Sequence, residues 1–246
     1  MSTKQPKGAI FASLAANIGV GISKFIAFAI TGSSAMLAEG IHSVADSSNQ
    51  ILLLLGDRQA KRAPDQAHPF GYGRTHFLYA FIVAIVLFSL GGIFAIYEGY
   101  EKIHNPHPVE SPIVAYVVLA VAMVLEGFAL RTAMKEASEF KPKNQNWWQF
   151  LRSTKSINHV VLTLEDTAAL IGLSFAAIGI TLSLVTDNPI WDGIGTLFIG
   201  ALLVVVATIL FIEVKSLLIG EAVDAATERK MLQIILGVDD VDHVVD

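Results

Sequence analysis

The chain is organised as long apolar stretches separated by short polar joints. A helix that crosses the ~30 Å hydrocarbon core of a membrane needs about 20 mostly apolar residues. Six stretches meet this requirement and predict six membrane-spanning helices. Their approximate ranges are Gly8–Ile30, Ser33–Gly56, His76–Tyr97, Pro112–Met134, His159–Val185 and Ile190–Glu213.

The joints between these stretches carry turn and helix-breaking residues. Thr31-Gly32-Ser33 separates the first two spans, and Asp187-Asn188-Pro189 separates the last two. The polar segment Met1–Lys7 leads directly into the first apolar stretch, with no small-residue cleavage site after it. We therefore interpret that stretch as a first membrane helix and not as a signal peptide.

The composition agrees with a membrane protein. Apolar residues make up 53% of the chain and charged residues only 16%, whereas a soluble domain carries about 25% charged residues. The net charge of -5 gives no basic excess that would favour nucleic acid. Cysteine does not occur in the sequence, so a metal site would have to use His, Asp, Glu or Asn.

The distribution of Lys and Arg predicts the orientation of the spans. Fifteen of the 17 Lys and Arg residues fall near the N-terminus, in the second-to-third and fourth-to-fifth connections, or after the sixth span. Lys24 lies within the first span, and Lys102 is the single residue on the opposite side. Positive residues favour the cytoplasmic side of a membrane. Both termini are therefore expected in the cytoplasm, and the expected location is the cell (inner) membrane.

Residues 1–220 are expected to form the transmembrane domain and residues 221–246 the start of a cytoplasmic α/β domain. Ala225–Leu236 has the pattern of a short helix, and Val241–Val245 has that of a strand. Because a lone strand is not stable in water, we expect this segment to be the truncated beginning of a larger domain.

The second span carries a polar stripe. At ~100° per residue, its polar side chains fall on one half of the helix, and apolar side chains occupy the other half. A charged side chain near the bilayer centre costs ~2.5–3.5 kcal/mol on insertion scales, so retained acids indicate a task. The polar residues are Glu39, His42, Ser43, Asp46, Ser47, Asn49 and Gln50.

His42 and Asp46 are the sharpest pair in this stripe. Their i, i+4 spacing makes them neighbours on one helix face, and imidazole with carboxylate suits zinc and related ions. The alternative is a His–Asp hydrogen bond that only fixes helix packing. Glu39 and Asn49 lie about one turn to either side, as further ligands, a proton acceptor or residues that orient the ligands.

The fifth span holds the adjacent acids Glu165 and Asp166. Their side chains diverge by ~100°, and Asp166 is the better ligand candidate. Glu165 is expected to contact another helix, with the region of Glu126 in the fourth span as the candidate position. Carboxylates that share a low-dielectric site cannot all ionise cheaply, which would couple metal to protons. His159, on the same face as Asp166, lines an entry path or is merely an interfacial residue.

Three motifs resemble the cation diffusion facilitator family. Ala38–Asp46 resembles the second helix of that family, and His68–Arg74 resembles the loop that leads into its third helix. Leu164–Ala169 resembles the fifth helix of a subgroup related to a mitochondrial zinc transporter branch. The resemblance covers essentially the whole chain, and it implies a cation-efflux-type bundle of six helices with both ends inside.

By this resemblance His42, Asp46 and Asp166 are ligands of the transported metal. The chain departs from the family pattern at Leu162, where many members have a His or Asp. Glu165, Glu126 or a water molecule are the candidates for the fourth ligand. The resemblance also implies a homodimer.

The loop before the third helix departs from the family pattern as well. Tyr72 stands where the family often has a second His. Whether Asp65 and His68 form a secondary metal site is left open by the sequence.

The sequence as a whole predicts a secondary transporter. It would move divalent cations, with Zn²⁺ as the first choice, out of the cytoplasm in exchange for protons by alternating access. We expect no catalytic residue and no prosthetic group. A non-transporting membrane scaffold is the alternative, and an intramembrane metal-dependent enzyme is a weaker one because the sequence has no His-Glu-x-x-His motif.

Overall fold

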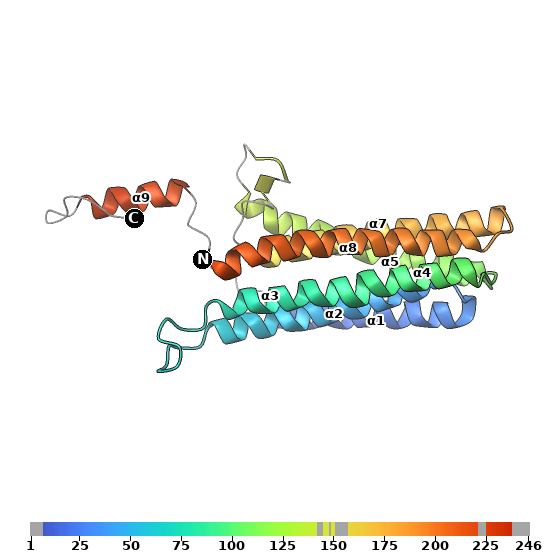
Figure 1. Cartoon of the computed structure of the whole chain (residues 1–246), viewed down its shortest axis with the longest axis horizontal. Coiled ribbons are helices and arrows are strands. Elements are labelled where there is room, and N and C mark those ends of the chain that lie inside the picture. Colours follow the sequence, from blue (N-terminus) through green and yellow to red (C-terminus); the bar gives the residue numbers. More distant parts are fainter. Residues whose placement is uncertain (1–6, 142–144, 148, 151–156, 221–224, 238–246) are drawn as a thin grey trace.

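The computed structural model describes residues 7–141, 145–147, 149–150, 157–220 and 225–237 of the chain. The described residues form long helices that run side by side, with the short helix α9 beyond one end (Figure 1). The helices are α1 Lys7–Thr31, α2 Ser34–Ala60, α3 Thr75–Val86, η1 Leu87–Ile93, α4 Phe94–His104, α5 Pro112–Phe140, α7 Ile157–Val185, α8 Ile190–Ile219 and α9 Ala225–Ile235. The strand predicted at Val241–Val245 lies outside the described residues.

Each of the six predicted spans coincides with a long helix of the structure, counting α3, η1 and α4 as one continuous helix. Among the described residues, four helices are long and apolar enough to cross a membrane. These four are Thr75–His104, Pro112–Glu139, Val160–Val185 and Ile190–Ile219. The described apolar part of α1 is shorter, and α2 carries the polar stripe, so membrane crossing by these two helices stays a prediction.

The third helix is longer than its apolar pattern predicts. It continues past Tyr97 to His104, so Lys102 lies within its last turns and not in the connection that follows. The middle of this helix, Leu87–Ile93, has π-helical hydrogen bonding. Such π segments interrupt the regular side-chain register of an α-helix.

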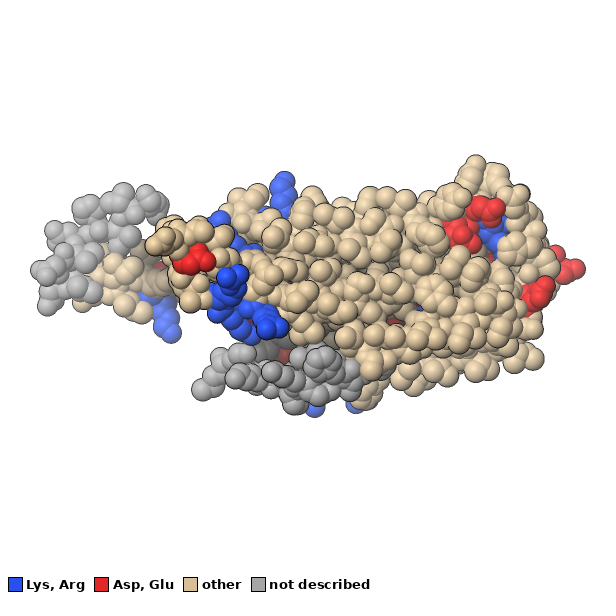
Figure 2. Space-filling view, turned by 90° about the horizontal axis from the view of Figure 1, so that it is seen from below, with Lys and Arg blue, Asp and Glu red and all other residues tan. Residues whose placement is uncertain are grey.

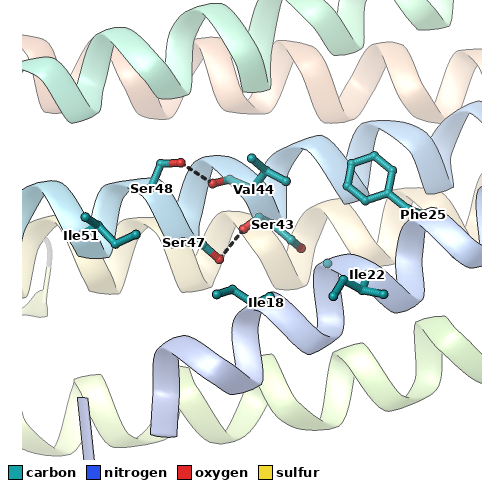
Figure 3. Close-up of a pocket in the computed structure, with 9 residues that line it drawn as sticks. Ile18, Ile22, Phe25, Ser43, Val44, Ser47, Ser48 and Ile51 are labelled. Atoms are coloured by element: carbon teal, nitrogen blue, oxygen red, sulfur yellow. Dashed lines mark hydrogen bonds between the residues drawn. The ribbon is translucent and has the colours of Figure 1, made fainter. Parts of the chain in front are cut away.

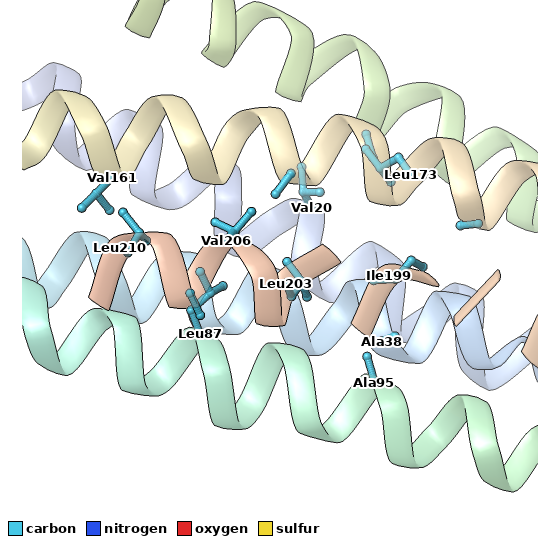
Figure 4. Packing of buried hydrophobic residues seen from close by; sticks show 14 of the residues in the cluster. Val20, Ala38, Leu87, Ala95, Val161, Leu173, Ile199, Leu203, Val206 and Leu210 are labelled. Atoms are coloured by element: carbon cyan, nitrogen blue, oxygen red, sulfur yellow. The ribbon is translucent and has the colours of Figure 1, made fainter. Parts of the chain in front are cut away.

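Helix α2 occupies the centre of the bundle, where it contacts α1, α3, α4, α7 and α8. Helix α8 packs on α7 and α4, and α5 packs on α7 and α1. Figure 4 shows the apolar core, with side chains such as Leu203, Val206 and Leu210 of α8 packed between α7 and the helix formed by α3, η1 and α4. This arrangement leaves the polar face of α2 directed into the bundle.

Glycines bring α8 very close to α4. A Cβ atom at Gly99 would lie 2.8 Å from the carbonyl oxygen of Gly193, and one at Gly200 would lie 2.7 Å from the backbone nitrogen of Ile96. Small residues at helix interfaces in membranes allow such backbone approach. The contact between α4 and α8 therefore depends on the absence of side chains at these positions.

The N-terminus of α2 is fixed to α8 by one buried carboxylate. Asp192 accepts hydrogen bonds from the Ser33 hydroxyl at 2.7 Å and from the Ser34 backbone N–H at 2.9 Å. The Lys102 ammonium lies 3.7 Å from the same carboxylate, and both side chains are fully buried. Lys102 also donates to the carbonyl oxygen of Gly32 at 2.9 Å. These contacts hold α2, α4 and α8 together at one end of the bundle.

Charged residues gather at the two ends of the molecule. Figure 2 shows Lys and Arg mainly toward the end nearest α9, Asp and Glu mainly at the opposite end, and a long uncharged surface between them. Many large apolar side chains of the helices are exposed, including Val124, Phe128 and Phe198. A surface of this kind is suited to a hydrocarbon environment.

The connection after α5 packs partly on its own protein. Trp147 meets Phe150 with their ring centroids 6.1 Å apart, and the Lys141 ammonium lies 5.6 Å from the Trp147 ring. Trp147 therefore packs on its own protein. Trp148 lies outside the described residues.

Candidate functional site

Helix α2 has the two faces that its sequence predicts. Glu39, His42 and Asn49 are buried, whereas Val44 and Ile51 are exposed. The polar stripe therefore faces other helices of the bundle. An exception on the apolar half is Ala45, which is fully buried.

His42 and Asp46 form a pair of unpartnered polar groups in the bundle interior. His42 Nδ1 lies 3.6 Å from Asp46 Oδ1, which is too long for a hydrogen bond. Both ring nitrogens of His42 and Oδ1 of Asp46 are buried without any hydrogen-bond partner. Since buried polar atoms in proteins are nearly always partnered, these atoms are candidates for binding a cation, and the 3.6 Å distance does not support a hydrogen bond that only fixes helix packing.

Glu165 contacts α2 directly. Its Oε1 accepts a hydrogen bond of 2.5 Å from the Asn49 side-chain amide, and both side chains are buried. Glu165 also lies within electrostatic range of Glu126 and Asp46. The prediction that Glu165 meets another helix is confirmed, and its hydrogen-bond partner is Asn49 of α2.

Asp166 lies on α7 within electrostatic range of Glu126 and Asp46. Helices α2, α5 and α7 therefore bring four carboxylates into one region, namely Asp46, Glu126, Glu165 and Asp166. Within the described part of the chain, however, no three His, Asp or Glu side chains are close enough together to hold a metal ion. His42 and Asp46 are adjacent in this structure, and the α7 acids do not lie close enough to complete a metal site with them.

Two further predicted positions contribute less to this picture. Leu162 is only half-buried, in the same helix as Asp166. His159 lies in the first turns of α7, but its side chain lies outside the described residues. Its predicted role in an entry path stays a prediction.

Lys24 of α1 belongs to the site, although its sequence position indicated only a charge within the first span. Its ammonium donates hydrogen bonds of 2.9 Å to Glu39 Oε2 and 2.9 Å to the Ser43 hydroxyl. Lys24 and Glu39 are both almost completely buried. Charged residues within membrane spans normally pair with one another, and this rule could have linked the lone Lys of the first span to an acid of the second.

The loop between α2 and α3 is closed by its own hydrogen bonds. Asp65 accepts from the Tyr72 hydroxyl at 2.6 Å and from the His68 backbone N–H at 2.8 Å. The Tyr72 hydrogen bond, followed by that of His68, holds the pKa of Asp65 below its ordinary value. His68 Nδ1 lies 3.4 Å from Asp65 Oδ1, and both side chains are exposed. A secondary metal site here stays a prediction.

Comparison with known proteins identifies the family of the chain. Residues 10–219 match the family described as the cation efflux transmembrane domain. The chain is 32% identical over 213 residues to the human mitochondrial proton-coupled zinc antiporter SLC30A9. The aligned segment covers 86% of this chain and 38% of the relative. It is 31% identical over 239 residues to metal tolerance protein C4 of Arabidopsis thaliana, covering 97% of this chain and 52% of the relative.

A bacterial relative matches a shorter part of the chain. The zinc transporter ZitB of Pectobacterium atrosepticum is 29% identical over 123 residues, which is 50% of this chain and 38% of the relative. The chain spans between 38% and 52% of the length of these three relatives. The matching family consists of transporters and not enzymes, which removes the intramembrane enzyme from the alternatives. The chain is thus a multi-pass membrane protein that belongs to the cation efflux family, the cation diffusion facilitators.

Proposed function

We propose that this chain carries Zn²⁺, or a closely related divalent cation, out of the cytoplasm in exchange for protons. His42 and Asp46 of α2 bind the ion together with Asp166 and Glu165 of α7. The observation that supports this most directly is the set of buried and unpartnered donor atoms of His42 and Asp46. The names of two relatives specify zinc, and one of these relatives is described as proton-coupled.

The residue types of the site make metal and protons competitors. A neutral imidazole and an ionised carboxylate bind a metal, whereas their protonated forms do not. Asp46, Glu126, Glu165 and Asp166 lie within electrostatic range of one another, so their negative charges are unfavourable together in a low-dielectric interior. Either a divalent cation or protons relieve this repulsion. Exchange of one for the other follows from the same chemistry.

Loading of the ion requires α7 to shift toward α2, because the α7 acids are not yet within ligand distance of His42 and Asp46. Glu165 can join the ion while its Oε1 accepts from Asn49, because a carboxylate has about four lone-pair sites. The buried contacts of Asp192 hold the N-terminal ends of α2 and α8 together, at the end of the bundle opposite α9. This arrangement supports entry of the ion from the end nearest α9.

The topology of the proposal has six membrane-spanning helices with both termini in the cytoplasm. The concentration of Lys and Arg at the end nearest α9 supports this orientation (Figure 2). The expected location is the cell (inner) membrane, and the expected assembly is a homodimer. Both expectations follow from the sequence and its family resemblance.

The test is transport by purified protein in proteoliposomes that contain a zinc dye and a pH dye. Asp46→Ala removes one predicted ligand and is expected to reduce zinc-dependent proton flux to the level of empty vesicles. Glu110→Gln, at an exposed position outside the helices, is the matched control and is expected to behave like the wild type. Unchanged transport by folded Asp46→Ala would refute the assigned site. A wild type that binds no zinc in calorimetric titrations would instead favour the non-transporting scaffold.

A further inference from the structure

Lys24 is a positive charge built into the membrane interior beside the proposed cation site. Its side chain is 1% exposed and that of its partner Glu39 is not exposed at all. Removing a buried charge from water is costly unless a partner compensates it. Removing either partner would therefore leave the other charge buried without compensation.

The position of Glu39 relative to the proposed ligands makes this pairing significant. Glu39 precedes His42 by three residues and Asp46 by seven, so the three lie along one face of α2. Oε1 of Glu39 has no hydrogen-bond partner, and it lies 2.6 Å from the place of a Cβ atom at Gly172. Without Lys24, the face would offer an unbroken row of three cation-binding groups. With Lys24 present, the Lys24 ammonium occupies the Glu39 end of this row.

The charge of Lys24 also reaches the rest of the site. Lys24 lies within electrostatic range of His42, Asp46 and Glu126. Charges in a buried region are screened much less than charges on a protein surface. A divalent ion bound at His42 and Asp46 would therefore experience repulsion from the Lys24 ammonium.

The described residues that line the groove beside Ser43 carry no positive charge. This groove of about 190 Å³ lies between α1 and α2. Apolar side chains such as Ile18, Ile22 and Ile51 line its walls (Figure 3). The hydroxyl of Ser47 donates to the Ser43 carbonyl oxygen of the same helix. Because the groove is apolar, the Lys24 ammonium is the group that compensates Glu39 from the α1 side.

We propose that Lys24 sets how many cations the transport site holds and how tightly it binds them, because its ammonium neutralises Glu39 and takes the place of a second cation beside His42. The inference rests on the function proposed above. It has two consequences: the site holds a single divalent ion, and repulsion from Lys24 keeps that ion weakly enough bound to be released.

The test compares zinc binding by the full chain in detergent, measured by calorimetric titration, for the wild type and three variants. Lys24→Gln leaves the Glu39 charge uncompensated and is expected to bind zinc at least about tenfold more tightly, which corresponds to ~1.4 kcal/mol, or to bind a second equivalent. Glu39→Gln leaves the Lys24 charge uncompensated and is expected to bind more weakly than the wild type. The double variant Lys24→Gln with Glu39→Gln removes both charges and is expected to return close to wild-type affinity with one ion per chain.

This ordering separates an electrostatic role from a structural one. If Lys24 only joined α1 to α2, all three variants would lose thermal stability, and the affinity of the folded fraction would not follow the sign of the charge change. That result would overturn the inference. If Lys24→Gln fails to fold, the comparison of Glu39→Gln with the double variant carries the same information. Weaker zinc binding by Glu39→Gln than by the double variant supports the inference. Equal zinc binding by Glu39→Gln and the double variant overturns it. Absence of zinc binding by the wild type would instead contradict the proposed function.

Discussion

Replacement of Asp192 tests how the central helix α2 is held in place. Its carboxylate accepts hydrogen bonds from the Ser33 hydroxyl, the Ser34 backbone N–H and the Ser34 hydroxyl, at 2.7, 2.9 and 3.2 Å. It also faces the buried Lys102 ammonium at 3.7 Å. Asp192→Ala removes all of these contacts at once and leaves Lys102 buried without its anionic partner.

The expected loss of stability can be estimated from this geometry. Breaking a buried ion pair by removing one partner costs about 3–5 kcal/mol. For a protein of this size each kcal/mol corresponds to about 2–4 °C, so the apparent Tm should fall by about 6–20 °C. Asp192→Asn keeps one acceptor oxygen but places an amide NH₂ where a second acceptor is needed. Because this variant also removes the negative charge beside Lys102, its loss is expected near the lower end of the range of about 3–5 kcal/mol.

The assay is the thermal unfolding of detergent-solubilised protein at one fixed heating rate, followed by fluorescence-detected size-exclusion chromatography. Glu110→Ala serves as the control because Glu110 is exposed at the same end of the bundle, and its Tm should change little. An Asp192→Ala variant as stable as this control would show that the carboxylate does not anchor α2. The role assigned to the buried contacts at this end would then be wrong.

Two further predictions concern Gly172 and the loop after α2. Gly172→Ala would place a Cβ atom 2.6 Å from Glu39 Oε1 and should destabilise the protein by ~1–3 kcal/mol. Gly127→Ala, which has open space around its Cβ position, is the control in the same unfolding assay. Equal Tm values for the two variants would contradict the close contact. Tyr72→Phe removes the strongest cause of the lowered pKa of Asp65, so NMR titration should show that pKa moving up toward its ordinary value. A carboxyl group with a lowered pKa stabilises the folded loop at pH values above its ordinary pKa, and this stabilisation is lost as the pH falls through the lowered pKa. The wild-type loop should therefore stay closed to a lower pH than the Tyr72→Phe loop. An unchanged Asp65 titration in the variant would contradict this.

The sequence by itself determined the position of the helices and the two faces of α2. Apolar length fixes where a helix can cross hydrocarbon, and the long helices coincide with the six apolar stretches to within several residues at their ends. Helical periodicity placed Glu39, His42 and Asn49 on one face, and all three are buried. These features depend on residues close together in the chain, so a local pattern is sufficient to predict them.

Only the tertiary structure decided which groups meet across the bundle. Lys24 with Glu39, Asn49 with Glu165, and Ser33 with Asp192 are separated by 15, 116 and 159 residues. Periodicity gives the face on which a side chain lies, but not the height and rotation at which two helices pack. Those are set by close contacts such as the glycines between α4 and α8, because backbone approach fixes which polar side chains can reach one another. The partner of each buried charge was therefore decided by the packing of the helices.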